Sequence, residues 1–523
     1  MDAVLLGFET LMRPEVLAFL FIGVVAGLTV GAIPGLNDNI AFAIFIPFSF
    51  SMPPTFALAL MVGLYCSTAV GGSIPAIMVK VPGTASAIIT TIDGNAMARQ
   101  GAPGKAIGIA ITSSVVGGLS SAIVLVFLAP PLAKFALRFG YVENFALGVL
   151  GLASVVGLLG GNVFKGLISA ALGLLVATVG LSQETGFPRF TFGIANLYEG
   201  VPFLPLLVGL FGITAVFELT EELVRERRAG RKPEALPRIS DRLILPSALV
   251  RRLIPTWVRC SIIGNVIGVI PGAGMLMAIF LGYERTSRVY KRKYEGRPGE
   301  AKWGEGAPEG IAAPEAANNA VVASSMVPLL SLGIPGNSVS ALFIAALMIH
   351  GMMPGPLLFI EHADIAWMII LAFVAGNLVM GPIAFGLVKT LTGMVYRLSK
   401  ELLIPTIALL CLSGAYSDEN AIFSIWVALI AGLVGYALRK LSIPHAPIIL
   451  ALVLGRQIED NFANSLIVSK GNWSIFIDPV NHPISLLLIA GATFFMLGPV
   501  FGFIRTWARK RWAARAAASR AVS

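Results

Sequence analysis

Residues 311–336 read IAAPEAANNAVVASSMVPLLSLGIPG and combine properties that rarely occur together. The segment is apolar enough to lie in a bilayer, yet it contains Glu315, Asn318, Asn319 and a Pro-Gly break at its end. Inside a membrane, an interrupted backbone is tolerated only where protein or a wet cavity satisfies the freed groups, and polar side chains there are usually functional. The stretch therefore predicts a functional site within a membrane domain.

The composition is that of a polytopic membrane protein. Of the 523 residues, 56% are hydrophobic and 13% are charged, and the mean hydropathy is +0.84. A soluble globular chain has about 25% charged residues. Apolar runs of about 20 residues, the length that crosses a bilayer as a helix, recur along the chain, and no period-two alternation of a membrane barrel appears. We expect an all-α polytopic membrane protein.

The charged residues and cysteines exclude several other classes. The formal net charge of +10 lies in loops and the C-terminal tail, which suits an anionic lipid bilayer. No basic patch in the sequence supports nucleic-acid binding, so nucleic acid is not an expected partner. The first residues lack a basic region, so we expect no cleavable signal peptide. The three cysteines have no metal-binding spacing, and no metal site or cofactor is predicted.

The Pro-Gly break at the end of the opening stretch belongs to a repeated pattern. An Ile-Pro-Gly or Val-Pro-Gly motif occurs at 33–35, 81–83, 270–272 and 334–336. VPGTASA, which begins at 81, resembles IPGNSVSA, which begins at 334, and each is followed by a second turn signal. The pattern predicts two halves of similar architecture.

Basic loops predict how the two halves are oriented. Residues 222–257 and 285–302 are rich in Lys and Arg, which places both in the cytoplasm. The segment between them must return to the side that it entered, so its Pro-Gly break predicts a re-entrant or broken hairpin, and 15–51 should form another. Each half then has about five crossings, an odd number, so the halves are expected to be inverted repeats. One extra C-terminal helix brings the C-terminus into the cytoplasm, and the N-terminus is expected in the periplasm.

These arguments divide the chain into six segments. We expect a first membrane repeat at 1–221, a basic cytoplasmic linker at 222–257, a second membrane repeat at 258–460, an external loop at 461–482, an extra transmembrane helix at 483–505 and a basic cytoplasmic tail at 506–523.

The four breaks predict an anion-binding site. Inverted repeats with discontinuous helices are a common plan of secondary transporters, and their substrate lies where the half-helices meet. Each break starts a half-helix whose free N–H groups and positive dipole end suit a carboxylate. The residues expected to bind substrate are Pro34, Gly35, Asn37, Asn39, Gly83, Thr84, Ser86, Gly272, Gly274, Gly336, Asn337 and Ser338. The alternative is that the breaks only cap helices and make kinks.

Polar side chains near the breaks are candidates for binding a coupling ion. A buried carboxylate either binds a cation or takes a proton, so the ion can be Na⁺ or H⁺. The candidates are Asp38, Asp93, Glu315, Asn318 and Asn319. In the alternative reading Asp38 caps a helix and Asp93 lies in a loop.

At these residues the chain resembles the large membrane subunit of the tripartite tricarboxylate transporters. The resemblance is carried by GIAAPEAANNAVVASSMVPLLSLGIPG from 310, ALMIHGMMPGPLLF from 346, GGSIPAIMVKVPG from 71 and GAIPGL from 31. It implies a bacterial inner-membrane symporter that takes up carboxylates using a sodium or proton gradient. It also implies a small four-span membrane subunit and a periplasmic solute-binding protein as partners. Asn37-Asp38-Asn39 replaces the Gly, Pro and small hydroxyl residues expected in this family, so tri-, di- and monocarboxylates all stay open as substrates.

Three alternative functions differ in what they require. A membrane-embedded enzyme would need a nucleophile–base pair or a metal cluster, and neither HExxH nor GxSxG occurs in the sequence, so an enzyme is not expected. An ion-coupled anion permease would work without the two partner proteins. A passive channel would conduct without an imposed ion gradient and without saturation.

Overall fold

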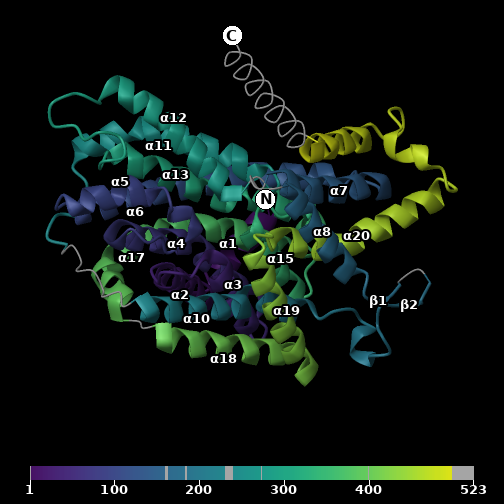
Figure 1. The fold of residues 1–523 in the computed structure, drawn as a ribbon. Helices are drawn as coiled ribbons and strands as arrows, with labels where there is room; N and C mark the ends of the chain where they lie inside the picture. Colours follow the sequence, from purple (N-terminus) through teal and green to yellow (C-terminus); the bar gives the residue numbers. More distant parts are fainter. Residues whose placement is uncertain are drawn as a thin grey trace, which may run out of the picture. The chain divides into compact units, whose positions relative to one another are not determined.

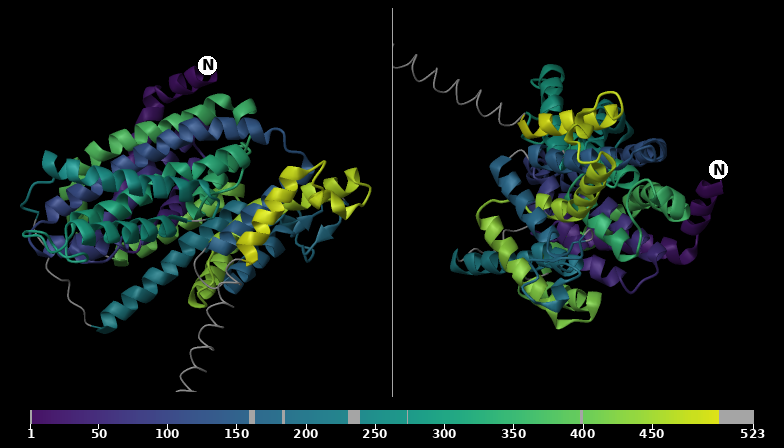
Figure 2. Two further views of the ribbon diagram at one scale, coloured as in Figure 1. Left: turned by 90° about the horizontal axis from the view of Figure 1, so that it is seen from above. Right: turned by 90° about the vertical axis from the view of Figure 1, so that its right-hand side faces the viewer.

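The computed structural model describes residues 2–158, 163–182, 185–229, 239–272, 274–397 and 400–497. In these ranges the chain is almost entirely helical, and the two views of Figure 2 show helices joined by loops. The β structure described is one short antiparallel pair, β1 (Gly180–Leu181) with β2 (Pro188–Arg189). Six helical segments are long and apolar enough to cross a membrane: Pro14–Gly31, Pro54–Val79, Pro103–Ala136, Phe203–Ala229, Ala363–Gly393 and Ile422–Lys440. The predicted all-α polytopic class is therefore confirmed.

The chain forms two compact units, and each is discontinuous in sequence. Unit 1 consists of Met1–Arg138 and Thr191–Leu441, and unit 2 consists of Phe139–Phe190 and Ser442–Ser523. Each unit thus contains segments from both predicted repeats. All four Pro-Gly breaks lie in unit 1.

Unit 1 has two buried central helices, α4 (Pro54–Val79) and α13 (Pro308–Ser324). Helix α4 packs against α2 (Pro14–Gly31) and α17 (Ala363–Arg397), whereas α13 packs against α11 (Ser247–Val269) and α6 (Pro103–Ala136) (Figure 1). Each central helix therefore contacts a glycine-rich helix of its own half and a long helix of the other half. This reciprocity is what two related halves would produce. The inverted orientation of the whole halves stays a prediction.

Glycines allow α2 and α11 to approach the central helices closely. A Cβ on Gly31 would lie 2.0 Å from the carbonyl oxygen of Thr68 in α4. A Cβ on Gly264 would lie 2.4 Å from the carbonyl oxygen of Ala317 in α13. No side chain fits at such distances, so both halves use the small-residue packing typical of membrane helices.

A helix begins shortly after each of the four breaks. The first break leads into α3 (Asp38–Ser49), and the second leads into η1 (Ala85–Ala87) and α5 (Thr90–Arg99). The third separates α11 from α12 (Gly274–Lys293), and the fourth separates α14 (Met326–Leu332) from α15 (Ser338–Ile349). Helices α11 and α12 pack on each other as a hairpin, whereas α2 and α3 make few mutual contacts and form a broken helix.

Two helices extend into the range predicted as the basic linker. The segment α9 (Phe203–Leu207), η3 (Val208–Ile213) and α10 (Thr214–Ala229) is continuous, and α11 begins at Ser247. The acidic side chains of α10 pair with basic ones on α18 (Lys400–Glu419) and α19 (Ile422–Lys440). These ion pairs explain why the helix continues beyond the apolar span. The remaining elements of unit 1 are α1 (Asp2–Leu11), η2 (Ala195–Leu197) and α16 (Leu358–Glu361).

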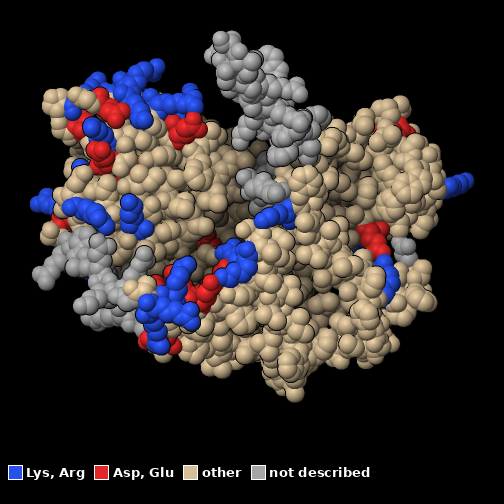
Figure 3. All heavy atoms as spheres, viewed as in Figure 1, with Lys and Arg blue, Asp and Glu red and all other residues tan. Residues whose placement is uncertain are grey.

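Charged side chains gather in a few places on the surface. Figure 3 shows them over α12 and the following loop, and over α10 and the beginning of α18, with extensive uncharged areas elsewhere. The basic residues of α12 are concentrated in its last turn, at Lys291, Arg292 and Lys293. Extensive uncharged surface on this face, with charges gathered over a few elements, fits a protein embedded in a bilayer.

Unit 2 contains α7 (Tyr141–Leu158), α8 (Val163–Ala177), α20 (Ala446–Val468), η4 (Trp473–Ile477) and a helix at Pro483–Leu497. Helix α20 packs against α7 and α8, with Leu450 and Leu454 in the core. His482 and Glu143 form a hydrogen-bonded pair 2.7 Å apart. The last part of the helix predicted at 483–505 and the tail predicted at 506–523 lie outside the described residues.

Candidate functional site

The structure brings the four Pro-Gly breaks together in unit 1. The third and fourth breaks touch, because the backbone N–H of Gly272 donates to the carbonyl oxygen of Gly336 at 2.9 Å. At the second break, a Cβ on Gly83 would lie 2.0 Å from the carbonyl oxygen of Gly31, which ends the helix before the first break. Helix α3 also packs on α15, and η1 packs on α12, so elements from the two halves meet here. The four breaks are therefore neighbours.

Helix α3 and the start of α15 converge on Tyr65 of α4. The Tyr65 hydroxyl lies 2.9 Å from Ser325 Oγ and 2.8 Å from Nδ2 of Asn337, the residue that precedes α15. Helix α3, which begins at Asp38, packs against both α4 and α15. Phe42 of α3 packs edge-on against the Tyr65 ring, with ring centroids 5.8 Å apart.

The two helices that converge on Tyr65 begin in the same way. Each has 12 residues and an asparagine at its N-cap. The Asn37 side chain accepts from Ile40 N at 3.0 Å, and the Asn337 side chain accepts from Ser340 N at 2.9 Å. The capping reading is therefore confirmed for these two amides. Capping satisfies only part of the free N–H groups in a first turn, so an anion can still be bound there.

The substrate candidates around the first break differ in their surroundings. Gly35 has a φ of +91°, which favours glycine, and a Cβ there would lie 3.1 Å from the Leu219 side chain of α10. Pro34 precedes it in the same turn. In the first turn of α3, Asp38 Oδ1 and Asn39 Oδ1 are buried, and neither bonds to any residue that the structure describes.

The other breaks place their candidates as follows. At the second break the Thr84 and Ser86 hydroxyls are 2.8 Å apart, and Thr84 covers Gly72 of α4. At the third, Gly274 has a φ of +71°, and a Cβ there would meet nothing within 4 Å. Ser338, at the fourth, is the half-buried first residue of α15. All twelve predicted substrate residues therefore flank the breaks, and their contact with a substrate stays a prediction.

Glu315 of α13 is enclosed by hydroxyl groups. Its carboxylate accepts from Ser73 of α4 and Thr90 of α5, both at 2.6 Å, and from Ser114 of α6 at 2.9 Å. Glu315 is 1% exposed, and among the described residues no basic side chain pairs with it. A buried carboxylate without a positive partner is unfavourable unless a proton or a cation neutralises it.

Two pairs of contacts show that α4 and α13 run antiparallel. Tyr65, early in α4, contacts Ser325, which directly follows α13, whereas Ser73, later in α4, contacts Glu315, earlier in α13. With a rise of about 1.5 Å per residue, the two contacts are separated by roughly 12–15 Å along the helices. Tyr65 and Glu315 therefore lie at opposite ends of the interface between α4 and α13, the corresponding helices of the two halves.

Asn318 and Asn319 lie one turn along α13 from Glu315. Both are buried, and the Oδ1 atom of each has no hydrogen-bond partner within the described part of the chain. The Asn319 amide donates to the Glu315 carbonyl oxygen at 3.2 Å, and Ser121 of α6 donates to the Asn319 carbonyl oxygen at 3.1 Å. Both asparagines therefore retain acceptor capacity within one helical turn of Glu315.

Asp93 of α5 lies among the groups that hold the loop before α13. Its carboxylate accepts from the Tyr283 hydroxyl of α12 at 2.8 Å and from the Ala307 N–H at 2.8 Å. The N–H groups of Gly304 and Gly306 each donate to it at 3.0 Å. With four donors, Asp93 fixes this loop, which is what a structural carboxylate does. An additional role as an ion ligand stays a prediction.

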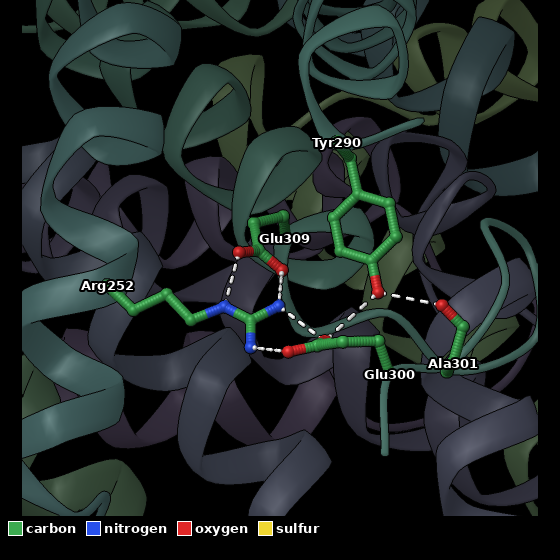
Figure 4. Close-up of polar contacts among 5 residues, drawn as sticks. All are labelled: Arg252, Tyr290, Glu300, Ala301 and Glu309. Atoms are coloured by element: carbon green, nitrogen blue, oxygen red, sulfur yellow. Dashed lines mark hydrogen bonds and ion pairs between the residues drawn. The ribbon is translucent and has the colours of Figure 1, made fainter. Parts of the chain in front are cut away.

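A second anchor holds the same loop to α11. Figure 4 shows the guanidinium of Arg252 between the carboxylates of Glu309 and Glu300. The distances are 2.7 Å from Nε to Glu309 and 2.6 Å from Nη1 to Glu300. Tyr290 donates to the Ala301 carbonyl oxygen at 2.7 Å. Hydrogen bonds from Arg252 hold the pKa of Glu300 below its usual value.

The sequence did not single out three of the residues that organise the site. Tyr65, Ser73 and Ser114 were unassigned, although each is a hydroxyl group in an apolar helix. A hydroxyl side chain in an apolar helix is the feature of the sequence that points to these residues, because a buried hydroxyl normally has a hydrogen-bond partner. The sequence does not show which group is that partner, because the partner lies in another helix.

The sequence matches one protein family and two known relatives. Residues 17–450 match the sequence profile described as the tripartite tricarboxylate transporter TctA family. The chain is 35% identical over 485 residues, 93% of each chain, to an uncharacterized 52.8 kDa protein in the TAR-I ttuC' 3' region of Agrobacterium vitis. It is 33% identical over 226 residues, 43% of this chain and 89% of the relative, to an uncharacterized protein in the TAR-II ttuC' 3' region of the same organism. No solved structure matches significantly.

Proposed function

This chain belongs to the tripartite tricarboxylate transporter TctA family, a family of multi-pass membrane transporters, and from that premise we propose that it carries out cation-coupled uptake of a small carboxylate. The observation that carries the proposal is the convergence of α3, through Phe42, and of the α15 start, through Asn337, on Tyr65. In this proposal the site binds a substrate for transport and does not catalyse a reaction. The protein lies in the bacterial inner membrane.

The substrate carboxylate binds at the starts of α3 and α15. Each helix start contributes the equivalent of about half a positive charge, so the two together balance roughly one carboxylate. Tyr65, Ser325 and Asn337 supply polar hydrogens at the same place. These groups come from both halves, so relative movement of the halves can open or close the site, as in alternating access.

Asp38 limits when the anion can bind. Its carboxylate stands at the start of α3, and a negative charge there opposes a bound carboxylate. We therefore expect Asp38 to be protonated, paired with a cation or hydrogen-bonded to a donor group of the substrate while the anion is present. Glu315, at the other end of the interface between α4 and α13, is a second point at which cation binding and substrate binding can be linked.

The family membership also supports the partners that we propose. A tripartite system contains two further proteins, which we take to be a small four-span membrane subunit and a periplasmic solute-binding protein that delivers the substrate. The cytoplasmic side is the one that carries the basic end of α12, and the N-terminus is periplasmic.

Uptake into proteoliposomes tests the proposal. The chain, its small subunit and the binding protein are reconstituted, and labelled tri-, di- and monocarboxylates are offered with a sodium gradient, a proton gradient or neither. Saturable uptake that needs one gradient and the binding protein is the expected result. Flux without a gradient and without saturation would identify a channel, and uptake without the binding protein would identify a partner-independent permease. Failure of every carboxylate under every gradient would refute the proposal.

A further inference from the structure

The Glu315 pocket has the charge and donor set of a site for one monovalent cation. The hydroxyl groups of Ser73, Thr90 and Ser114, from three other helices, all lie within hydrogen-bond distance of the Glu315 carboxylate, two at Oε1 and one at Oε2. A hydroxyl group can donate to the carboxylate or, after rotating, offer a lone pair to a cation. The single negative charge has no basic partner among the described residues, so one positive charge makes the pocket neutral.

We propose that Glu315, Ser73, Thr90 and Ser114 form the binding site of the coupling cation, which is a sodium ion or a proton. This inference rests on the proposed symport and selects one site from several candidates. Asp93 differs, because four donors already occupy its carboxylate and one of them is the backbone N–H of Ala307, the residue before α13. Asp93 is a positioning residue, and the cation does not touch it.

Helix α5 connects the cation site to the loop before α13. Thr90 and Asp93 lie one turn apart on α5, so the hydrogen bonds of Asp93 hold α5 in the position in which Thr90 bonds Glu315. Loss of the cation would leave a buried charge at Glu315, which must then be hydrated or move. Movement of Glu315 is transmitted along α13 to Ser325 and hence to Tyr65 at the substrate site.

Ion binding by the purified full-length chain tests the assignment without transport. Thermal unfolding is followed in detergent at constant ionic strength, with sodium, potassium or choline chloride at pH 8, and with choline chloride at pH 5 and pH 8. The variants are Glu315→Gln, Ser73→Ala, Thr90→Val and Ser114→Ala. Ser331→Ala is the matched hydroxyl control, because Ser331 is equally buried but bonds within its own helix. Asp93→Asn is the matched carboxylate control.

A sodium-specific rise in melting temperature identifies a sodium site, and a rise from pH 8 to pH 5 in choline identifies a proton site. Either rise should disappear in Glu315→Gln. Each hydroxyl variant should raise the half-saturating sodium concentration by about tenfold or more if sodium is bound. Ser331→Ala should respond like the wild type. Asp93→Asn should melt earlier and, because it only displaces Thr90, should weaken the ion response less than Glu315→Gln does.

Two results would overturn the inference: a Glu315→Gln variant that keeps the full ion response, or loss of the response in Asp93→Asn with retention in Glu315→Gln. Absence of any sodium or pH response in the wild type would also overturn it. If the response depends on Glu315 but no carboxylate is transported under any gradient, the cation site stands and the proposed uptake function fails.

Discussion

Replacement of Gly336 tests whether close contact of the breaks is needed for transport. A Cβ at this position would lie 2.8 Å from both the carbonyl oxygen and the Cβ of Ser325, and 2.9 Å from its Cα. Real Cβ atoms do not approach backbone so closely, so even alanine must move the fourth break away from α13. Gly336 does not adopt a positive φ, so the substitution tests steric contact and not backbone conformation.

The magnitude follows from overpacking. Inserting one methyl group into a tightly packed site costs about 1–3 kcal/mol. The same movement stretches the 2.9 Å bond from Gly272 N and displaces Asn337 from Tyr65. If that free energy opposes the binding-competent arrangement, Gly336→Ala should weaken substrate binding by about fivefold to 150-fold, and Gly336→Leu should abolish uptake while membrane insertion is retained.

Initial uptake rates of labelled carboxylate in proteoliposomes measure this effect, and thermal unfolding in detergent reports the fold. Gly386→Ala is the matched control, because Gly386 is an exposed glycine in α17 and a Cβ there would meet nothing within 4 Å. The control should keep normal uptake and gain up to about 1 kcal/mol of helix stability. Normal uptake by Gly336→Leu would refute the assignment of the fourth break to the site.

Three further substitutions test other parts of the structure. Tyr65→Phe should reduce substrate affinity by about tenfold with little loss of thermal stability, since it removes only the hydroxyl that contacts Ser325 and Asn337. Unchanged affinity would contradict a role of Tyr65 in substrate binding. Arg252→Gln should destabilise the folded chain by about 3 kcal/mol in chemical unfolding, because Glu309 is left buried without its partner. Arg252 lowers the pKa of Glu300 from its usual 4.5, so the stability contributed by this pair is present above pH 4.5 and is lost as the pH falls below it. On acidification the wild type should therefore lose more free energy of unfolding than Arg252→Gln. Equal losses would contradict this. Lys400→Gln should weaken the packing of α10 on α18, because Lys400 bonds Glu226 at 2.7 Å and Glu222 at 3.2 Å, and high salt should lower the melting temperature of the wild type more than that of the variant.

The sequence by itself determined the class of the protein and which polar side chains lie in its apolar segments. High hydropathy and the scarcity of charge require membrane helices, because only internally hydrogen-bonded segments are stable in lipid. Proline and glycine determined where the helices break, since proline lacks the backbone donor and glycine tolerates the turn. Glu315, Asn318 and Asn319 were recognisable because polar side chains in such a segment require a reason to be there.

Only the tertiary structure decided which of these groups meet. The hydroxyls around Glu315 come from three other helices, and Tyr65 reaches Asn337 across most of the chain, so no local spacing encodes these contacts. Asp93 shows the converse, since its sequence setting resembles that of the other carboxylates but its partners are the N–H groups of a distant loop. A residue type defines which bonds a side chain can make, whereas helix packing determines which partner lies within reach.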